Sequence, residues 1–176
     1  IRRAQKDGLI VIDATCPLVA KVHIEVHRYV KLGYRIILIG HRGHDEVIGT
    51  MSEAPHRIHL VTCLEEAESL QLPESDSLVV LTQTTLSIDD CNRIMEALRR
   101  RFPGLETPPK EDICYATTNR QHAVRDMAGD SELVLVVGSK NSSNSVRLTE
   151  IAESVGTKAY LLDDKSELDH AWFDGV

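Results

Sequence analysis

The strongest constraint on the fold is the alternation of short strand patterns with helical patterns along the chain. Arg35–Ile39 and Ser77–Thr82 contain continuous runs of apolar residues, mostly branched, which are typical of parallel strands buried on both faces. Pro17–Leu32 instead carries an apolar residue at every fourth position, which indicates a helix, and Gly33 ends it. Strands that alternate with helices in this way predict parallel sheets covered by helices, an α/β fold.

The alternation is interrupted once, by the proline-containing connector at residues 107–110, and then starts again. We therefore expect two consecutive three-layer α/β/α units with mostly parallel sheets, at residues 16–110 and 111–176. Residues 1–15 would be the remnant of an upstream domain. The chain lacks an initiator methionine and ends where another strand could begin. We expect it to be an internal piece of a longer protein, with its last unit incomplete.

The remaining elements follow from the same two patterns. A short strand is expected at Leu9–Asp13, and a last helix near Ser166–Trp172. The other expected strands are Arg57–Thr62, Glu132–Val137 and Lys158–Leu162, and the other expected helices are Glu65–Leu70, a helix from Ser87 or Asp89 to about Arg101, Thr117–Ala128, a short helix after Glu46 and a helix ending near Val155.

Composition excludes several classes of partner. The chain has 27 acidic and 20 basic residues, a net charge of −7, and no basic stripe, which argues against nucleic-acid binding. It has no apolar run near the roughly 20 residues needed to cross a bilayer, so no membrane contact is expected. Its four cysteines lie far apart and form no CxxC pair. This spacing favours a reducing compartment, where thiols bind metal or take part in chemistry.

Two of the cysteines occur in similar settings. Cys16 follows a strand-like run and precedes Pro17, which can begin a helix, and Cys114 lies where a loop meets a helical pattern. The free N–H groups and dipole of a helix N-terminus favour a thiolate. By its position alone, Cys114 would more ordinarily be a small buried residue. Because both begin helices in an α/β pattern, we interpret them as ligands of one centre.

Polar loops follow several of the expected strands. In a parallel sheet ligands bind beyond the carboxyl ends of the strands, so these loops predict a site. The loops contain His44 with Glu46, Thr84 with Thr85, and the serine-rich stretch 138–145. A histidine can hold an anion, Glu46 can transfer a proton, and a serine-rich helix start can bind phosphate. Each loop taken alone could also be no more than a helix cap.

Five motifs in order now resemble those of one family. They are 'DATCPLVAKVH', 'LIGHRGHDEVIGTM', 'TQTTLS', 'DICYATTNRQ' and 'VVGSKNSSNS'. Together they resemble 4-hydroxy-3-methylbut-2-enyl diphosphate reductase, the last enzyme of the non-mevalonate isoprenoid pathway, across nearly the whole chain. The resemblance implies three pseudo-symmetric α/β domains around a 4Fe–4S cluster held by three cysteines, in a bacterial cytoplasmic enzyme.

The resemblance also implies a role for individual residues. Cys16 and Cys114 match two cluster ligands, with the third cysteine outside this chain. Glu46 matches the acid that donates a proton, and Thr84 matches the hydroxyl beside it. The residues that match the diphosphate-binding set are His44, Ser142, Ser143 and Asn144.

The activity implied is reductive dehydroxylation of the diphosphate substrate to isopentenyl and dimethylallyl diphosphate. Electrons would come from a low-potential donor such as ferredoxin or flavodoxin. This chain alone is expected to be inactive. Two alternatives stay open: a phosphosugar-binding domain of the isomerase type, which leaves Cys16 and Cys114 unexplained, and a catalytically silent diphosphate-binding module.

Overall fold

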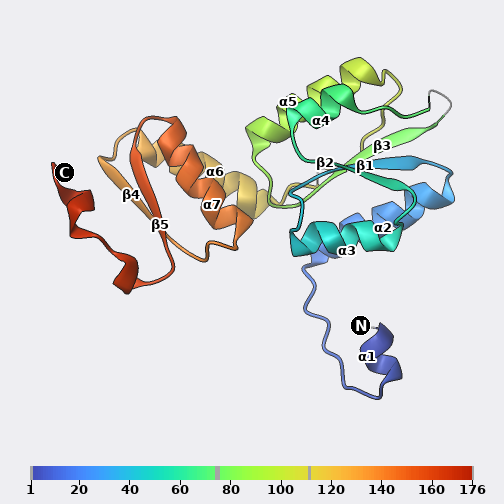
Figure 1. Cartoon of the computed structure of the whole chain (residues 1–176), viewed down its shortest axis with the longest axis horizontal. Helices are drawn as coiled ribbons and strands as arrows, with labels where there is room; N and C mark the ends of the chain where they lie inside the picture. Colours follow the sequence, from blue (N-terminus) through green and yellow to red (C-terminus); the bar gives the residue numbers. More distant parts are fainter. Residues whose placement is uncertain (1, 74–75, 111, 176) are drawn as a thin grey trace.

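The computed structural model describes residues 2–73, 76–110 and 112–175. Its first unit contains a parallel three-stranded sheet in the order β2-β1-β3, and its second unit contains a parallel two-stranded sheet, β4-β5 (Figure 1). The elements, in chain order, are α1 (Arg2–Lys6), α2 (Pro17–Lys31), β1 (Arg35–Ile39), α3 (Asp45–Glu53), β2 (Ile58–Val61), α4 (Leu64–Ser69), β3 (Leu78–Thr82), α5 (Ile88–Arg101), α6 (Tyr115–Ala128), β4 (Leu133–Val137), α7 (Ser143–Ser154), β5 (Lys158–Leu162) and two 3-10 helices, η1 (Lys165–Glu167) and η2 (His170–Phe173).

The first unit has the three layers that the sequence predicts. Successive residues of the central strand β1 face opposite sides of the sheet. Ile36 and Leu38 pack with α2 and α3, whereas Ile37 and Ile39 pack with α4 and α5. All four side chains are almost completely buried, which explains why this strand is a continuous apolar run. The α/β class and the parallel sheets are therefore confirmed.

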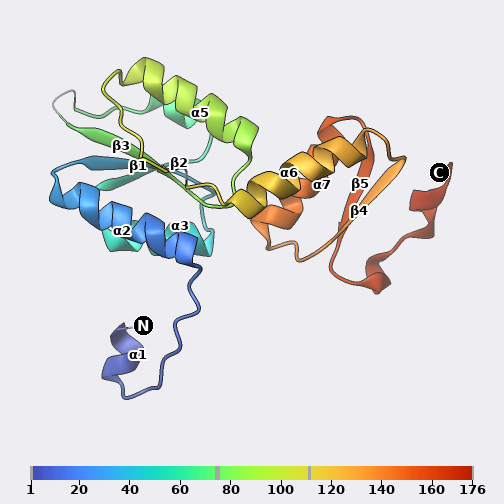
Figure 2. The same cartoon turned by 180° about the vertical axis from the view of Figure 1, so that it is seen from behind.

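The second unit differs from the three-layer prediction. Helices α6 and α7 lie side by side next to the β4–β5 sheet, and their shared core with it includes Ala128, Val134, Ala152 and Ala159 (Figures 1 and 2). After β5, the ring of Trp172 in η2 stacks on Tyr160 at a centroid separation of 4.1 Å. The described residues thus form one helical layer and one sheet layer, followed by short 3-10 turns.

Two predicted elements are wrong. Leu9–Asp13 is not a strand; in the described chain no strand lies beside it to share a hydrogen-bond ladder, and Ile10 is 98% exposed. The last predicted helix, Ser166–Trp172, is replaced by η1 and η2, because Asp164 and Asp169 each begin a separate short turn with their side chains. Figures 1 and 2 show α1 and the segment after it extending away from the first unit.

The chain just before the 107–110 connector pairs with the edge strand β3 at Glu106. The Val80 N–H donates to the Glu106 carbonyl, and the Glu106 N–H donates to the Leu78 carbonyl, both at 2.9 Å. Glu106 therefore extends the first sheet at its edge before the chain passes through the connector to α6. The predicted boundary at residue 111 lies outside the described residues, as do residues 1 and 176, the two ends of the predicted domains.

Candidate functional site

The carboxyl ends of β1 and β3 bring together two of the predicted loops. Residues 40–44 follow β1 and lead into α3, and residues 83–87 follow β3 and lead into α5. Because β1 and β3 are neighbouring parallel strands, both loops leave the sheet at the same edge. The N-terminus of α7, from the second unit, meets them there.

Glu46 and Thr84 are in direct contact across these loops. The Thr84 N–H donates to Oε1 of Glu46 at 2.7 Å, and the Thr84 hydroxyl donates to Oε2 at 3.0 Å. Thr84 is 4% exposed, so it cannot readily turn away. Thr84, which is 38 residues from Glu46 in the sequence, thus holds both oxygens of the Glu46 carboxylate in one orientation.

His44 begins α3 and presents one ring nitrogen outward. Its Nδ1 accepts a hydrogen bond from the Glu46 N–H at 3.2 Å. This bond leaves Nε2 as the nitrogen that carries the proton of the neutral ring, so His44 can donate to an anion. The helix cap and the anion-binding interpretation of this residue are therefore compatible.

The three α7 residues have different environments. The hydroxyl oxygen of Ser142 accepts from the Ser145 N–H at 3.3 Å and caps the helix. The Ser143 hydroxyl donates to the Thr85 carbonyl at 3.1 Å and lies 3.4 Å from Nδ1 of His41. The Oδ1 atom of Asn144 is buried and has no hydrogen-bond partner. The Ser143 contacts join the second unit to the first, and the Oδ1 atom of Asn144 is a buried acceptor without a donor.

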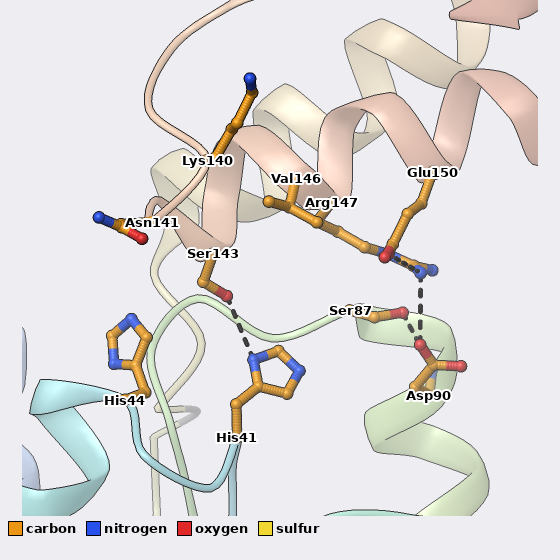
Figure 3. A pocket seen from close by; sticks show the side chains of 10 residues that line it. All are labelled: His41, His44, Ser87, Asp90, Lys140, Asn141, Ser143, Val146, Arg147 and Glu150. Carbon is orange, nitrogen blue, oxygen red and sulfur yellow. Dashed lines mark hydrogen bonds and ion pairs between the residues drawn. The ribbon is translucent and has the colours of Figure 1, made fainter. Parts of the chain in front are cut away.

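A cavity of about 210 Å³ lies between the units (Figure 3). His41, His44 and Ser143 line one end of it. At the other end Arg147 is paired with Asp90 at 3.3 Å and with Glu150 at 3.0 Å, so its charge is compensated. Burial, and secondarily the charge of His44, holds the pKa of His41 below its ordinary value.

The two candidate cysteine ligands both occupy helix N-caps. Cys16 is the N-cap of α2 and is exposed, and Cys114 is the N-cap of α6 and is half-buried. Neither thiol forms a disulfide or a capping hydrogen bond. Two uncommitted thiols at helix N-termini fit the thiolate donors of an iron–sulfur cluster. In the part of the chain that the structure describes, no group of three or more metal-ligating side chains is gathered.

Sequence reasoning missed three polar residues at this edge of the sheet. Gln83 is 1% exposed and connects the two loops: its Oε1 accepts from the His41 N–H, and its Nε2 donates to the Thr85 hydroxyl, both at 2.9 Å. The other two are Lys21 and Asp112, which form an ion pair at 2.9 Å. Gln83 stands inside the 'TQTTLS' motif, but nothing in the motif indicates that its side chain turns inward.

Comparisons with known proteins cover the whole chain. A family model described as "LytB protein" matches residues 1–176. The 4-hydroxy-3-methylbut-2-enyl diphosphate reductases of Azotobacter vinelandii and Bifidobacterium longum are 54% and 52% identical to it, over 99% and 98% of this chain. These matches take in 57% and 50% of the two relatives, so the chain spans about half their length.

Two solved structures are also similar. The E-1-hydroxy-2-methyl-but-2-enyl-4-diphosphate reductase of Plasmodium falciparum matches 99% of this chain and 55% of its own, with a TM-score of 0.95 and 45% identity. A structure of (E)-4-hydroxy-3-methyl-but-2-enyl diphosphate reductase, described as the terminal enzyme of the non-mevalonate pathway, matches with a TM-score of 0.61 and 30% identity, over 99% of this chain and 62% of its own. No helix in residues 2–73, 76–110 or 112–175 has the length and apolar content needed to span a bilayer.

Proposed function

The chain belongs to the LytB protein family, and on that premise we propose that the whole protein reduces 4-hydroxy-3-methylbut-2-enyl diphosphate. The hydroxyl group would leave as water, giving isopentenyl or dimethylallyl diphosphate. The observation that carries the proposal is the Glu46–Thr84 contact at the edge of the sheet, with the helix start of α7 beside it. This arrangement places an oriented carboxyl group next to side chains and backbone N–H groups that can donate hydrogen bonds to an anion.

In this proposal Glu46 supplies the proton that leaves with the hydroxyl. The reaction breaks a carbon–oxygen bond, and two electrons and a further proton complete the product. Thr84 fixes the orientation of the Glu46 carboxyl group, because its N–H and its hydroxyl each donate a hydrogen bond to one carboxyl oxygen. A positioned acid of this kind typically contributes ~10²-fold or more to a rate.

The diphosphate would be held by the groups that begin helices α3 and α7. His44 would donate from Nε2, and Ser142 still has a hydroxyl proton to donate. Ser143 would exchange its bond to the Thr85 carbonyl for one to the diphosphate. The N-terminus of α7 adds backbone N–H groups and a favourable dipole. Holding the diphosphate fixes the far end of the substrate, and so orients the reacting carbon.

Cys16 and Cys114 would hold a 4Fe–4S cluster together with a cysteine outside this chain. When bound, such a cluster supplies low-potential electrons and an iron able to act as a Lewis acid. Its electrons would come from a donor such as ferredoxin or flavodoxin. The contribution of this chain is to present two thiols at the N-termini of helices α2 and α6.

The test compares variants of the acid and of the anion site in the whole protein. We expect Glu46→Gln to lower kcat ~10²-fold or more, with substrate binding nearly unchanged, because glutamine keeps the shape but carries no proton. Ser142→Ala is the comparison variant, and we expect it to raise KM with a smaller effect on kcat, because its hydroxyl would donate to the diphosphate and not to the reacting carbon. Anaerobic kinetics with an artificial reductant measures both. Near-normal turnover in Glu46→Gln would show that the proton comes from another group.

A further inference from the structure

Asp112 is a buried carboxylate that ties the connector to the first unit. Its side chain is 1% exposed. One oxygen, Oδ1, accepts from the Lys21 ammonium at 2.9 Å, and the other, Oδ2, accepts from the Thr82 N–H at 3.0 Å. Lys21 also donates to the Lys110 carbonyl at 2.8 Å. The segment before α6 is therefore fastened to helix α2 and to the end of strand β3 together.

Both anchors lie close in sequence to a candidate ligand. Lys21 is in α2 five residues after Cys16, a distance of about 7.5 Å along a helix axis. Asp112 precedes Cys114 by two residues, and the Cys114 N–H donates to the Thr84 carbonyl at 2.9 Å. The ion pair and this hydrogen bond therefore fix where α6 begins relative to α2, and with it the spacing of the two N-cap thiols.

Burial makes this ion pair different from the exposed pairs of the chain. Exposed pairs contribute little to stability, because water screens them and their side chains must be ordered. A buried carboxylate depends on its partner, since an unpaired charge away from water is strongly unfavourable. Without the Lys21 ammonium, the 112–114 segment is expected to move toward water. The Cys114 thiol would move with it.

We propose that Lys21 and Asp112 are positioning residues that set the separation of the Cys16 and Cys114 thiols before any cluster is bound. The two side chains touch neither thiol in the described contacts and act through helix α2 and the 112–114 segment. The consequence for cluster assembly rests on the proposed function. The effect on the separation of the thiols does not rest on the proposed function, and it can be measured without iron.

The first experiment measures thiol separation in the cluster-free whole protein, with every cysteine except Cys16 and Cys114 replaced. The readout is the rate of cross-linking by a short bis-maleimide divided by the rate of single alkylation, which corrects for thiol reactivity. We expect Lys21→Met to lower this ratio ~10-fold, a population change that corresponds to about 1.4 kcal/mol. Lys21→Arg, which keeps a cation that can pair, should restore most of it.

The matched control is Arg35→Met. Arg35 pairs with Asp76, and its side chain is 25% exposed, the same fraction as that of Lys21. This pair lies at the opposite end of β1 from the site. We expect Arg35→Met to leave the cross-linking ratio unchanged, whatever it does to thermal stability. Asp112→Asn serves as a second variant if Lys21→Met does not fold, because it keeps the shape that accepts from the Thr82 N–H.

The second experiment follows cluster retention in the same variants with all native cysteines present. We expect faster loss of visible absorbance to a chelator in Lys21→Met than in Arg35→Met. An unchanged cross-linking ratio in Lys21→Met and Asp112→Asn would overturn the positioning role. A lowered ratio with a normal, stable cluster would support the positioning of the thiols but overturn their assignment as ligands, which is a failure of the proposed function alone.

Discussion

Replacing Gln83 with leucine should loosen the loop that carries His44 and Glu46. The Gln83 side chain bridges the loops after β1 and β3, with one hydrogen bond to the His41 N–H and one to the Thr85 hydroxyl. Leucine has nearly the same volume, so the substitution leaves little cavity. Its effect is to delete both bonds and to leave their partners without an internal replacement.

The size of the effect follows from those two bonds. Each bond contributes about 1 kcal/mol net, and a buried group left unsatisfied adds about 1–2 kcal/mol more, so we expect a loss of about 3–4 kcal/mol. If this loss lowers the free energy of local opening of the loop, hydrogen exchange of the His41 amide should accelerate ~30-fold or more.

The assay is hydrogen–deuterium exchange of residues 40–46 in the whole protein, and the chain offers a matched control. Gln121 is 4% exposed and also makes two hydrogen bonds, donating to the Leu86 carbonyl and accepting from the Ile88 N–H. Gln121→Leu removes two hydrogen bonds of the same kind at Leu86 and Ile88, neither of which involves residues 40–46. We expect it to destabilise the protein similarly without changing exchange at residues 40–46. Equal acceleration there in both variants would refute the bridging role of Gln83.

Two further predictions concern the same loop. Gly40→Ala should destabilise the protein by about 1–3 kcal/mol in urea unfolding, because an added Cβ would lie 2.6 Å from a methyl of Val47; no loss would mean that α3 shifts freely. The lowered pKa of His41 means that the unfolded chain binds its proton more readily, so stability should fall as the pH drops below 6.5. His41→Asn should flatten that part of the pH profile, and an unchanged slope would count against this cause.

The sequence predicts elements best where burial alone decides them. The apolar runs of β1 and β3 need two covered faces, and the structure has them. Leu9–Asp13 carries a similar run, but a strand also needs a neighbour, and a local pattern says nothing about one. The same limit applies to Ser166–Trp172, where two aspartate caps break the segment into short turns.

The location of the candidate site could be predicted from the sequence, but the residues that hold its loops and helices in place could not. Parallel strands bring their carboxyl ends to one edge, so the meeting of the Glu46 and Thr84 loops follows from the fold class. Lys21 and Asp112 are 91 residues apart, and charged residues in a sequence are ordinarily expected in water. Only the three-dimensional path of the connector shows that this aspartate is buried.

The most direct test of the central claim is the iron content and visible spectrum of the whole protein purified without oxygen. We expect a brown protein with about four iron atoms, and a large loss of both colour and iron in Cys16→Ser and in Cys114→Ser. Cys63→Ser is the matched control, since Cys63 is also a helix N-cap without a capping bond, and it should keep its cluster. A colourless, iron-free protein, or Cys16→Ser and Cys114→Ser variants with unchanged iron, would contradict the account.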